Sequence, residues 1–289
     1  MKKWLLSIVV AISLVSLLGC GSSEEAATQE TTFEKVKREG FVTVGFANEA
    51  PYAYATPDGK LTGEAVEIAR VILQRLGIEE MNGVLTEFGS LIPGLKANRF
   101  DMITAGMYIT ADRAKEVDFA NPEYSIGEGI AVVAGNPINI KSYEDIVNNS
   151  DVKVAVMGGA IQFNYLTSVG VKESQIHIVP DNPSALDALI AGRVDVIAMT
   201  GPSLQAVLDA ANNDRVERVM DFVQPVIDGV NVRGYGATAF RKGETDFVDV
   251  FNAELEKLKE SGELLEILEQ FGFTEQELPG DATVDSLTK

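Results

Sequence analysis

The sequence predicts an α/β protein built from two similar lobes that the chain crosses between twice. Short apolar runs alternate with amphipathic segments, which is typical of α/β domains. One phrase occurs twice, as LKANRFDMI at residues 95–103 and as LIAGRVDVI at residues 189–197. A weaker match relates residues 42–44 to residues 152–154. We interpret this as one architecture used twice; the alternative is chance recurrence of a common helix–strand phrase.

The first lobe is predicted to comprise residues 33–132 together with a return segment at 233–273. Ala65, Ile68 and Ile72 recur with the period of a helix, and Gly77 follows as a stop signal. The expected strands are 41–46, 84–88, 101–105 and 235–240, and the expected helices are 64–76, 91–97, a helix from residue 245 and 262–270.

The second lobe is predicted at residues 133–232. Ser184 is expected to cap a helix that runs to Ala191. The two crossings are expected near residues 130–134 and 226–232, and residues 274–289 form a polar tail. The expected strands are 151–157, 176–179 and 194–199.

The N-terminus has the pattern of an export signal. Lys2 and Lys3 precede a short apolar stretch that ends just before Cys20, the chain's single cysteine. Residues 1–19 are therefore predicted to be a lipoprotein signal peptide, with the lipid on Cys20 and a flexible tether at 20–32. The alternative is an ordinary membrane anchor with an incidental cysteine. The expected location is extracytoplasmic, attached to the cell membrane through the lipid.

Composition excludes several classes of function. The formal charge of −19 repels phosphates, so no nucleic-acid partner is expected. The chain has neither the sequence motifs of nucleophilic hydrolases nor a cluster of metal ligands. Its one histidine, His177, lies at the start of an expected strand. We therefore expect no enzyme activity, no metal and no cofactor. Glu49 as a general base is the residue that an enzymatic alternative would use.

Candidate binding residues follow the predicted strands, because open α/β sheets bind ligands beyond the carboxyl ends of their strands. Three aromatic residues, Tyr52, Phe88 and Tyr108, each follow a different strand of the first lobe. Three converging rings form a cage for a delocalised cation, whereas separate packing of each ring on its loop is the alternative. The other candidates at strand ends are Asn48, Glu49, Gly106 and Thr110 in the first lobe and Ala160 and Thr200 in the second.

Arg113 is the most specific of the candidate binding residues. It lies in the first turn of a helix that Thr110 is expected to cap, where a cation opposes the helix dipole. A bidentate grip on a ligand carboxylate explains this placement, and a surface ion pair with Asp112 or Glu116 is the alternative. Glu49 is expected to accept N–H groups of a cationic ligand; otherwise it is a solvated loop charge.

These stretches resemble the polar amino-acid class of ABC-importer solute-binding proteins over about residues 33–273. The members that bind ectoine and hydroxyectoine are the most similar, on the phrases GFANEAPY (45–52), PDGKLTGE (57–64), EFGSLIPGL (87–95) and AGMYIT (105–110) with Arg113. The resemblance implies the two-lobed periplasmic-binding-protein fold of type II. It also implies a monomer that delivers a small zwitterion to membrane-embedded permease subunits.

Roles carry over position by position. Tyr52, Phe88 and Tyr108 would enclose the solute ring, Arg113 would hold its carboxylate and Glu49 would accept its ring N–H groups. Thr200 stands where amino-acid binders of this class usually have an aspartate for the ammonium group, so an ordinary amino acid loses an anchor. Ala160 replaces a usual hydroxyl residue, and backbone N–H groups at this helix start or Gln162 are the candidates to take over its role. The alternatives are a receptor for a polar amino acid or a betaine, or an enzyme of this fold such as a dehydratase.

Overall fold

The computed structural model describes residues 30–289. The predicted signal peptide, Cys20 and most of the predicted tether lie outside the described residues. Within the described range, no helix combines the length and the apolar character needed to cross a membrane.

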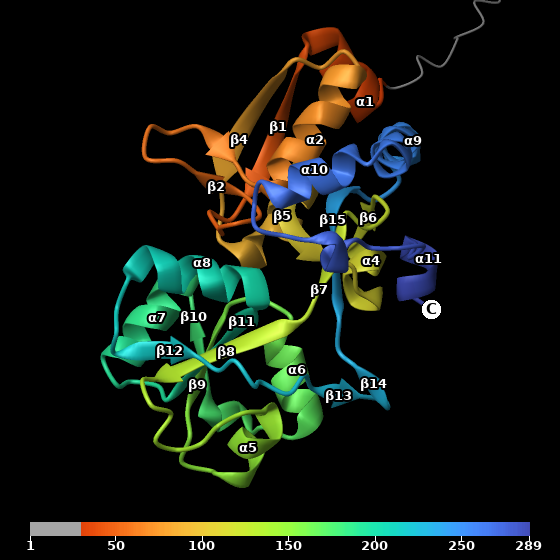
Figure 1. The fold of residues 1–289 in the computed structure, drawn as a ribbon. Helices are drawn as coiled ribbons and strands as arrows, with labels where there is room; N and C mark the ends of the chain where they lie inside the picture. The colour runs from red at the N-terminus through yellow and green to blue at the C-terminus, as the bar shows by residue number, and fades with distance from the viewer. Residues whose placement is uncertain (1–29) are drawn as a thin grey trace, which may run out of the picture. The chain divides into compact units, whose positions relative to one another are not determined.

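Lobe 1 is built on a six-stranded sheet with the order β4-β1-β5-β15-β6, and β7 also pairs with β15 (Figure 1). β1, β4 and β5 are parallel, whereas β15 is antiparallel to its neighbours. The strands are β1 (Phe41–Phe46), β4 (Glu80–Leu85), β5 (Met102–Tyr108), β6 (Val117–Phe119), β7 (Tyr124–Ile126) and β15 (Gly234–Arg241), with a small separate pair, β2 (Tyr54–Ala55) and β3 (Leu61–Thr62).

Helices cover both faces of this sheet, because alternate strand residues point to opposite sides. Met102 and Phe240 pack toward α2 (Glu64–Arg75) and α9 (Thr245–Ser261), whereas Ile103 and Ala239 pack toward α3 (Leu91–Lys96). The helices of lobe 1 are α1 (Thr32–Glu39), α2 (Glu64–Arg75), α3 (Leu91–Lys96), α4 (Ala111–Glu116), α9 (Thr245–Ser261), α10 (Glu263–Glu269) and α11 (Val284–Leu287).

Lobe 2 has a five-stranded sheet with the order β10-β9-β11-β8-β12. α5 and α6 pack on one face with Val154 and Val156, and α7 and α8 pack on the other with Ala155 and Ile197. The strands are β8 (Glu128–Val133), β9 (Val154–Met157), β10 (Ile176–Val179), β11 (Val196–Thr200) and β12 (Val216–Arg218), with a hairpin of β13 (Val226–Ile227) and β14 (Val230–Asn231). The helices are α5 (Tyr143–Asn148), α6 (Gln162–Val169), α7 (Asn182–Ile190) and α8 (Gly201–Ala211).

The repeated phrase adopts the same structure in both lobes. Asn98 and Gly192, at equivalent positions, both take a positive φ, of 56° and 66°. The aspartate of each phrase then fixes the neighbouring strand: Asp101 Oδ2 accepts from the Thr43 N–H at 3.0 Å, and Asp195 Oδ2 accepts from the Lys153 N–H at 2.8 Å. The recurrence is therefore structural and not a coincidence of composition.

Three predictions at segment boundaries need correction. β7 ends at Ile126 and β8 begins at Glu128 in the second sheet, so the first change of sheet precedes residues 130–134. Residues 130–132 are instead the buried interior of β8, which ends at Val133. Asp181, not Ser184, caps α7, because its carboxylate accepts from the Ser184 N–H at 2.7 Å. Residues 274–289 are not an appendage: Val284 and Leu287 pack against the core of lobe 1.

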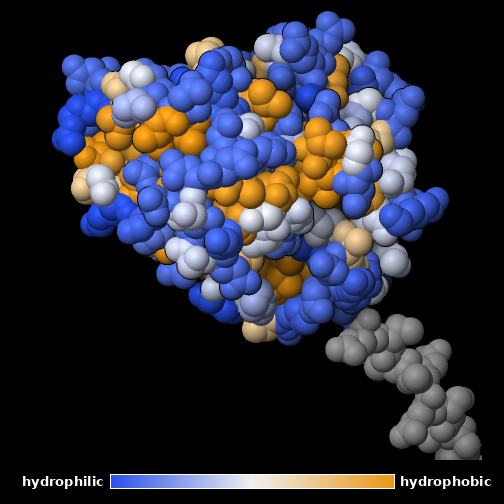
Figure 2. Space-filling model, turned by 90° about the horizontal axis from the view of Figure 1, so that it is seen from below, coloured by the Kyte–Doolittle hydropathy of each residue, from blue (hydrophilic) through white to orange (hydrophobic). Residues whose placement is uncertain are grey.

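Figure 2 shows one face of the molecule, on which hydrophilic side chains predominate and apolar ones form patches between them. The acidic composition accounts for a well-solvated surface. Among the described residues, the exposed large apolar side chains of the segment that leads back to lobe 1 are Met220, Val223, Val226 and Val230.

Candidate functional site

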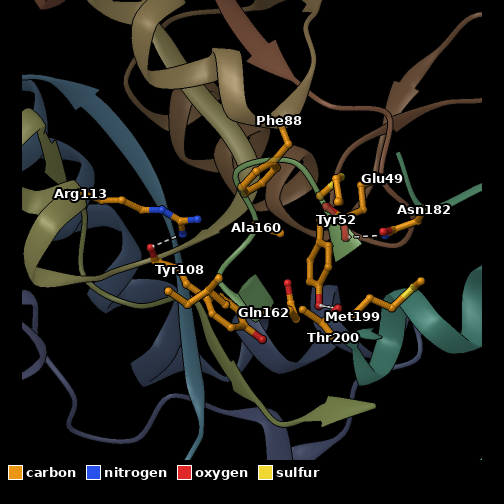
Figure 3. Close-up of a pocket in the computed structure, with 13 residues that line it drawn as sticks. Glu49, Tyr52, Phe88, Tyr108, Arg113, Ala160, Gln162, Asn182, Met199 and Thr200 are labelled. Carbon is orange, nitrogen blue, oxygen red and sulfur yellow. Dashed lines mark hydrogen bonds between the residues drawn. The ribbon is translucent and has the colours of Figure 1, made fainter. Parts of the chain in front are cut away.

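Side chains from both lobes line a cavity (Figure 3). Eight of the ten predicted binding residues line it. Lobe 1 contributes Glu49, Tyr52, Phe88, Gly106, Tyr108 and Arg113, and lobe 2 contributes Met157, Ala160, Ile161, Gln162, Asn182, Met199 and Thr200. The strand-end argument thus located the cavity, although it identified the residues of lobe 2 incompletely.

Three rings predicted from separate strand ends do meet at this cavity. Tyr52 and Tyr108 are joined by Tyr124, which stacks on Tyr52 at 5.3 Å and meets Tyr108 edge-on at 6.5 Å between ring centroids. Phe88 lies across the cavity from them, at the start of a 3₁₀ turn (Phe88–Ser90). Burial raises the pKa of Tyr52 and Tyr108 well above the usual range of phenols, so both hydroxyls stay neutral.

Glycines in β5 and β15 make room for the tyrosines. A Cβ at Gly106 would lie 2.6 Å from the Tyr52 ring, and φ at that residue is +60°. A Cβ at Gly234 would lie 1.8 Å from Tyr108, and one at Gly236 would lie 2.1 Å from Tyr124. Such separations are impossible for carbon atoms, so the rings can lie flat on the sheet only where side chains are missing.

Arg113 reaches the cavity from α4, which Thr110 caps as predicted. Its Nη1 donates to the Tyr108 carbonyl at 2.8 Å and its Nη2 donates to the Gly159 carbonyl at 2.9 Å. The guanidinium also lies 5.5 Å from the centroid of the Phe88 ring. Since a guanidinium has five N–H donors, others remain available for a ligand.

The alternative of a surface ion pair for Arg113 fails. Asp112 pairs with Lys115 at 2.7 Å, and Glu116 pairs with Lys96. Burial lowers the pKa of Arg113 to about 10, and the guanidinium therefore remains charged at neutral pH. A cation desolvated in this way is stabilised when an anion enters the cavity.

Glu49 is not a solvated loop charge. Its Oε1 accepts from Asn182 Nδ2 at 2.9 Å and from Ser203 Oγ at 2.7 Å, and both donors belong to lobe 2. Its Oε2 has no hydrogen-bond partner within residues 30–289. Burial raises the pKa of Glu49, and the two hydrogen bonds oppose that shift.

Two further contacts hold the lobes against one another. Tyr52 Oη and Thr200 Oγ1 are hydrogen-bonded at 2.8 Å, so Thr200 meets a residue of lobe 1. Gly159 approaches Gly89 so closely that a Cβ at Gly159 would lie 2.5 Å from the Gly89 Cα. The structure therefore shows the lobes closed over the cavity.

Asn48 and Thr110 do not line the cavity. Asn48 has φ of 53°, and its Oδ1 accepts from the Ala55 N–H at 2.9 Å, so it shapes the loop instead. Ala160 lines the cavity, but its N–H donates to the Met157 carbonyl at 3.1 Å and is not free for a ligand.

Several lining residues were missed by the sequence reasoning. Asn182 begins α7 three residues after the end of β10, which is a usable signal. Gln162 begins α6 shortly after a glycine pair and was considered only as a substitute for the hydroxyl absent at Ala160. Tyr124 and the glycines of β15 carried no such signal, because they belong to the segments of the chain that pass between the lobes. Within the part of the chain that the structure describes, no cluster of His, Cys, Asp and Glu could hold a metal ion.

Known proteins share this architecture. The model of the family "Bacterial extracellular solute-binding proteins, family 3" matches residues 42–275. A probable amino-acid ABC transporter periplasmic-binding protein of Sinorhizobium fredii, y4tE, is 38% identical over 260 residues, which cover 89% of this chain and 85% of that protein. The L-cystine-binding protein TcyA of Bacillus subtilis is 28% identical, with 92% and 96% covered.

Solved structures agree with this assignment. The crystal structure of EhuB in complex with hydroxyectoine superimposes with a TM-score of 0.80 at 35% identity, covering 89% of this chain and 97% of EhuB. The ancestral amino-acid-binding protein AncCDT-1, a precursor of cyclohexadienyl dehydratase, has a TM-score of 0.72 at 26% identity, covering 83% and 99%. The predicted fold is thus confirmed, and this chain belongs to family 3 of the bacterial extracellular solute-binding proteins, with the type II periplasmic-binding-protein fold.

Proposed function

We propose that this protein captures a small zwitterionic compatible solute of the ectoine or hydroxyectoine type. As a family member it is the solute-binding component of an ABC importer of the amino-acid class. The finer identity of the ligand rests on one observation: a single closed cavity brings aromatic faces, a desolvated guanidinium and a carboxylate together.

Each part of the cavity matches one part of such a solute. A charge-delocalised amidinium ring fits between Phe88 and the tyrosines, and each cation–π contact contributes about 0.5–2 kcal/mol when water is excluded. The free N–H donors of Arg113 suit its carboxylate. Glu49 Oε2, which has no partner in the described part of the chain, suits the ring N–H groups. The likeness to EhuB, solved with hydroxyectoine, supports the same ligand class.

The mechanism we propose is hinge closure. The solute docks on the rings and Arg113 of lobe 1, and lobe 2 closes over it through Thr200, Asn182 and Gly159. Ligand shifts the population toward the closed form, because the contacts across the cavity exist only there. A monomer in this form is then read by the permease subunits in the membrane.

Isothermal titration calorimetry tests the ligand. The panel is ectoine, hydroxyectoine, glycine betaine, proline, glutamine, arginine and cystine. We expect ectoine or hydroxyectoine to bind most tightly, with a favourable enthalpy from the charged hydrogen bonds. Tighter binding of glutamine, arginine or cystine would make this an amino-acid receptor, and tighter binding of glycine betaine would remove Glu49 from recognition, since a betaine has no N–H to donate.

An enzymatic function is the second candidate, because AncCDT-1 is described as a precursor of a dehydratase. The relatives reported above are otherwise binding proteins. Incubation with each solute of the panel followed by NMR is expected to return every solute unchanged, and any turnover would contradict a pure receptor role.

We also propose that Cys20 carries a lipid that holds the protein at the outer side of the cell membrane. Mass spectrometry of the protein from membranes is expected to find a diacylglyceryl group on Cys20. Release of an unmodified Cys20→Ala variant into the medium or periplasm would agree with this, and membrane retention of that variant would contradict it.

A further inference from the structure

Glu128 is a buried carboxyl that the proposed recognition does not use. It is the first residue of β8, directly after the change of sheet. Gln224, from the returning segment, fixes its backbone: Gln224 Nε2 donates to the Glu128 carbonyl and the Glu128 N–H donates to Gln224 Oε1, each at 2.8 Å. A Cβ at Gly127 would lie 2.9 Å from that amide. The position of Glu128 is therefore fixed by both crossing segments.

Its side chain points toward the cavity. Thr200, which lines the cavity, is the direct cross-strand partner of Glu128, and such partners project to the same face of a sheet. Gln162, another lining residue, donates from Nε2 to Glu128 Oε2 at 2.6 Å. Glu128 Oε1 has no hydrogen-bond partner among residues 30–289. Glu128 thus lies behind Gln162, one side chain removed from the ligand.

This contact decides which end of the Gln162 amide is offered to the cavity. A side-chain amide has a donor end and an acceptor end. An ionised carboxylate only accepts, so it binds the NH₂ group and leaves Gln162 Oε1 for the ligand. A protonated carboxyl gains one O–H donor. When that O–H is directed at Gln162 it binds Oε1, and a half turn of the amide leaves the NH₂ group for the ligand.

The surroundings of Glu128 allow both states near neutral pH. Burial raises the pKa of Glu128 to about 7, the hydrogen bond from Gln162 lowers it, and the charge of Glu49 raises it. No cation is paired with it in the described range. The titratable groups that face it or its neighbours are Glu49 from the loop after β1, Tyr52 of that loop, Tyr108 of β5, Tyr143 of α5, Tyr165 of α6 and, beside Tyr165, Arg113 of α4.

We propose that Glu128 is a positioning residue whose protonation state sets the polarity of Gln162 toward the ligand, as an acceptor when Glu128 is ionised and as a donor when it is protonated. The site then favours solutes rich in N–H or hydroxyl donors above neutral pH and loses that preference below it. For the identity of the solute, this inference rests on the proposed function.

The first test uses ligand-free protein, because Glu128 and Gln162 both belong to lobe 2. The side-chain amide resonances of Gln162, assigned by their loss in Gln162→Leu, are followed by NMR as the pH is raised through about 7. We expect them to titrate together with the Glu128 carboxyl and to become independent of pH in Glu128→Gln. Glu217→Gln, which removes an exposed carboxyl of the same lobe, is expected to leave the titration intact. Flat resonances in the unaltered protein, or titration that survives in Glu128→Gln, would overturn the inference.

The second test measures the affinity for ectoine over the same range. We expect roughly fivefold tighter binding above the midpoint than below it, and a much smaller dependence on pH in Glu128→Gln. If the Gln162 amide titrates but ectoine does not bind at any pH, the proposed ligand is wrong and the positioning role stands. If ectoine binds equally well across the range, the role of Glu128 in recognition is wrong. Should Glu128→Gln fail to fold, Glu128→Asp replaces it, and an unchanged midpoint there would contradict the proposal.

Discussion

The two lobes share one architecture but contribute opposite chemistry to the cavity. Every aromatic and every charged side chain that lines it, namely Glu49, Tyr52, Phe88, Tyr108 and Arg113, comes from lobe 1. Lobe 2 contributes thioethers, amides, a hydroxyl and aliphatic groups. The two lobes therefore have the same fold but different roles. We infer that lobe 1 selects the ligand, and that lobe 2 closes on it and adds polar contacts to it.

The comparison predicts the largest loss of affinity from Arg113→Ala. The variant removes the only cation among the described residues that line the cavity. It leaves a ligand carboxylate buried without its partner, which costs about 3 kcal/mol, or roughly 100-fold in Kd. Arg113→Lys keeps the charge but not the fork of donors, and we expect roughly tenfold weaker binding from it. Calorimetry with ectoine measures both. Equal affinities of all three proteins would show that lobe 1 does not hold the carboxylate.

The aromatic contribution is expected to be smaller. Phe88→Ala removes one face of the cage and the ring under the guanidinium, and we expect roughly tenfold weaker binding. Phe222→Ala is the matched control, because that ring packs on the core of lobe 2 and does not line the cavity. Both variants lower the free energy of unfolding, but only the first is expected to change Kd. Unchanged affinity in Phe88→Ala would remove the ring from recognition.

Closure by lobe 2 is tested with two glycines of similar conformation. Gly159 and Gly192 have φ of 79° and 66°, so alanine strains both. Only at Gly159 does the new methyl group meet the other lobe, 2.5 Å from the Gly89 Cα, whereas nothing lies within 4 Å at Gly192. We expect Gly159→Ala to weaken ectoine binding about fivefold by opposing the closed form. Small-angle scattering with ligand should show it more open than Gly192→Ala, whose affinity should stay unchanged; equal behaviour would contradict a closure role for Gly159.

Most of lobe 1's share of the site was predictable from sequence, because in a parallel sheet the strand order along the chain already brings the strand ends to one edge. Tyr52, Phe88 and Arg113 follow strands and Tyr108 is the last residue of β5, so the order of the strands was enough to place them together. Asn48 shows the limit of that argument. It follows β1 as well, but a positive φ turns its side chain back to the Ala55 N–H.

The other omissions have physical causes. Tyr124, Gly234 and Gly236 form the floor under the rings, yet they come from segments that change sheet, and their pairing depends on long-range register. Glu128 was missed for a related reason. Residues 128–132 were assigned to lobe 1 with no strand expected there, whereas they belong to β8, whose pairing with Thr200 in the second sheet points the carboxyl toward the cavity.

The buried carboxyls extend the comparison of the lobes from ligand affinity to stability. Lobe 1 buries Glu64 and Glu123 completely, and neither Glu64 carboxylate oxygen has a hydrogen-bond partner in the described residues. Burial raises the pKa of both, to about 7 for Glu123, and the neighbouring Glu123 raises that of Glu64 further. At a pH below the ordinary carboxyl pKa, these glutamates are protonated in both the folded and the unfolded chain, so their burial carries no penalty from ionisation. As the pH rises toward about 7, the unfolded chain loses the proton first, so the folded state loses stability.

We therefore expect Glu123→Gln to raise the free energy of unfolding by about 2 kcal/mol at pH 8 and to change it little near pH 4. Urea titrations at the two pH values measure the difference, with Glu79→Gln as an exposed control in lobe 1. The same variant should leave the pH dependence of ectoine binding as it is in the unaltered protein, because that dependence is assigned to Glu128 of lobe 2. If Glu123→Gln altered the pH dependence of binding and Glu128→Gln altered only stability, the roles assigned to these two carboxyls would be wrong.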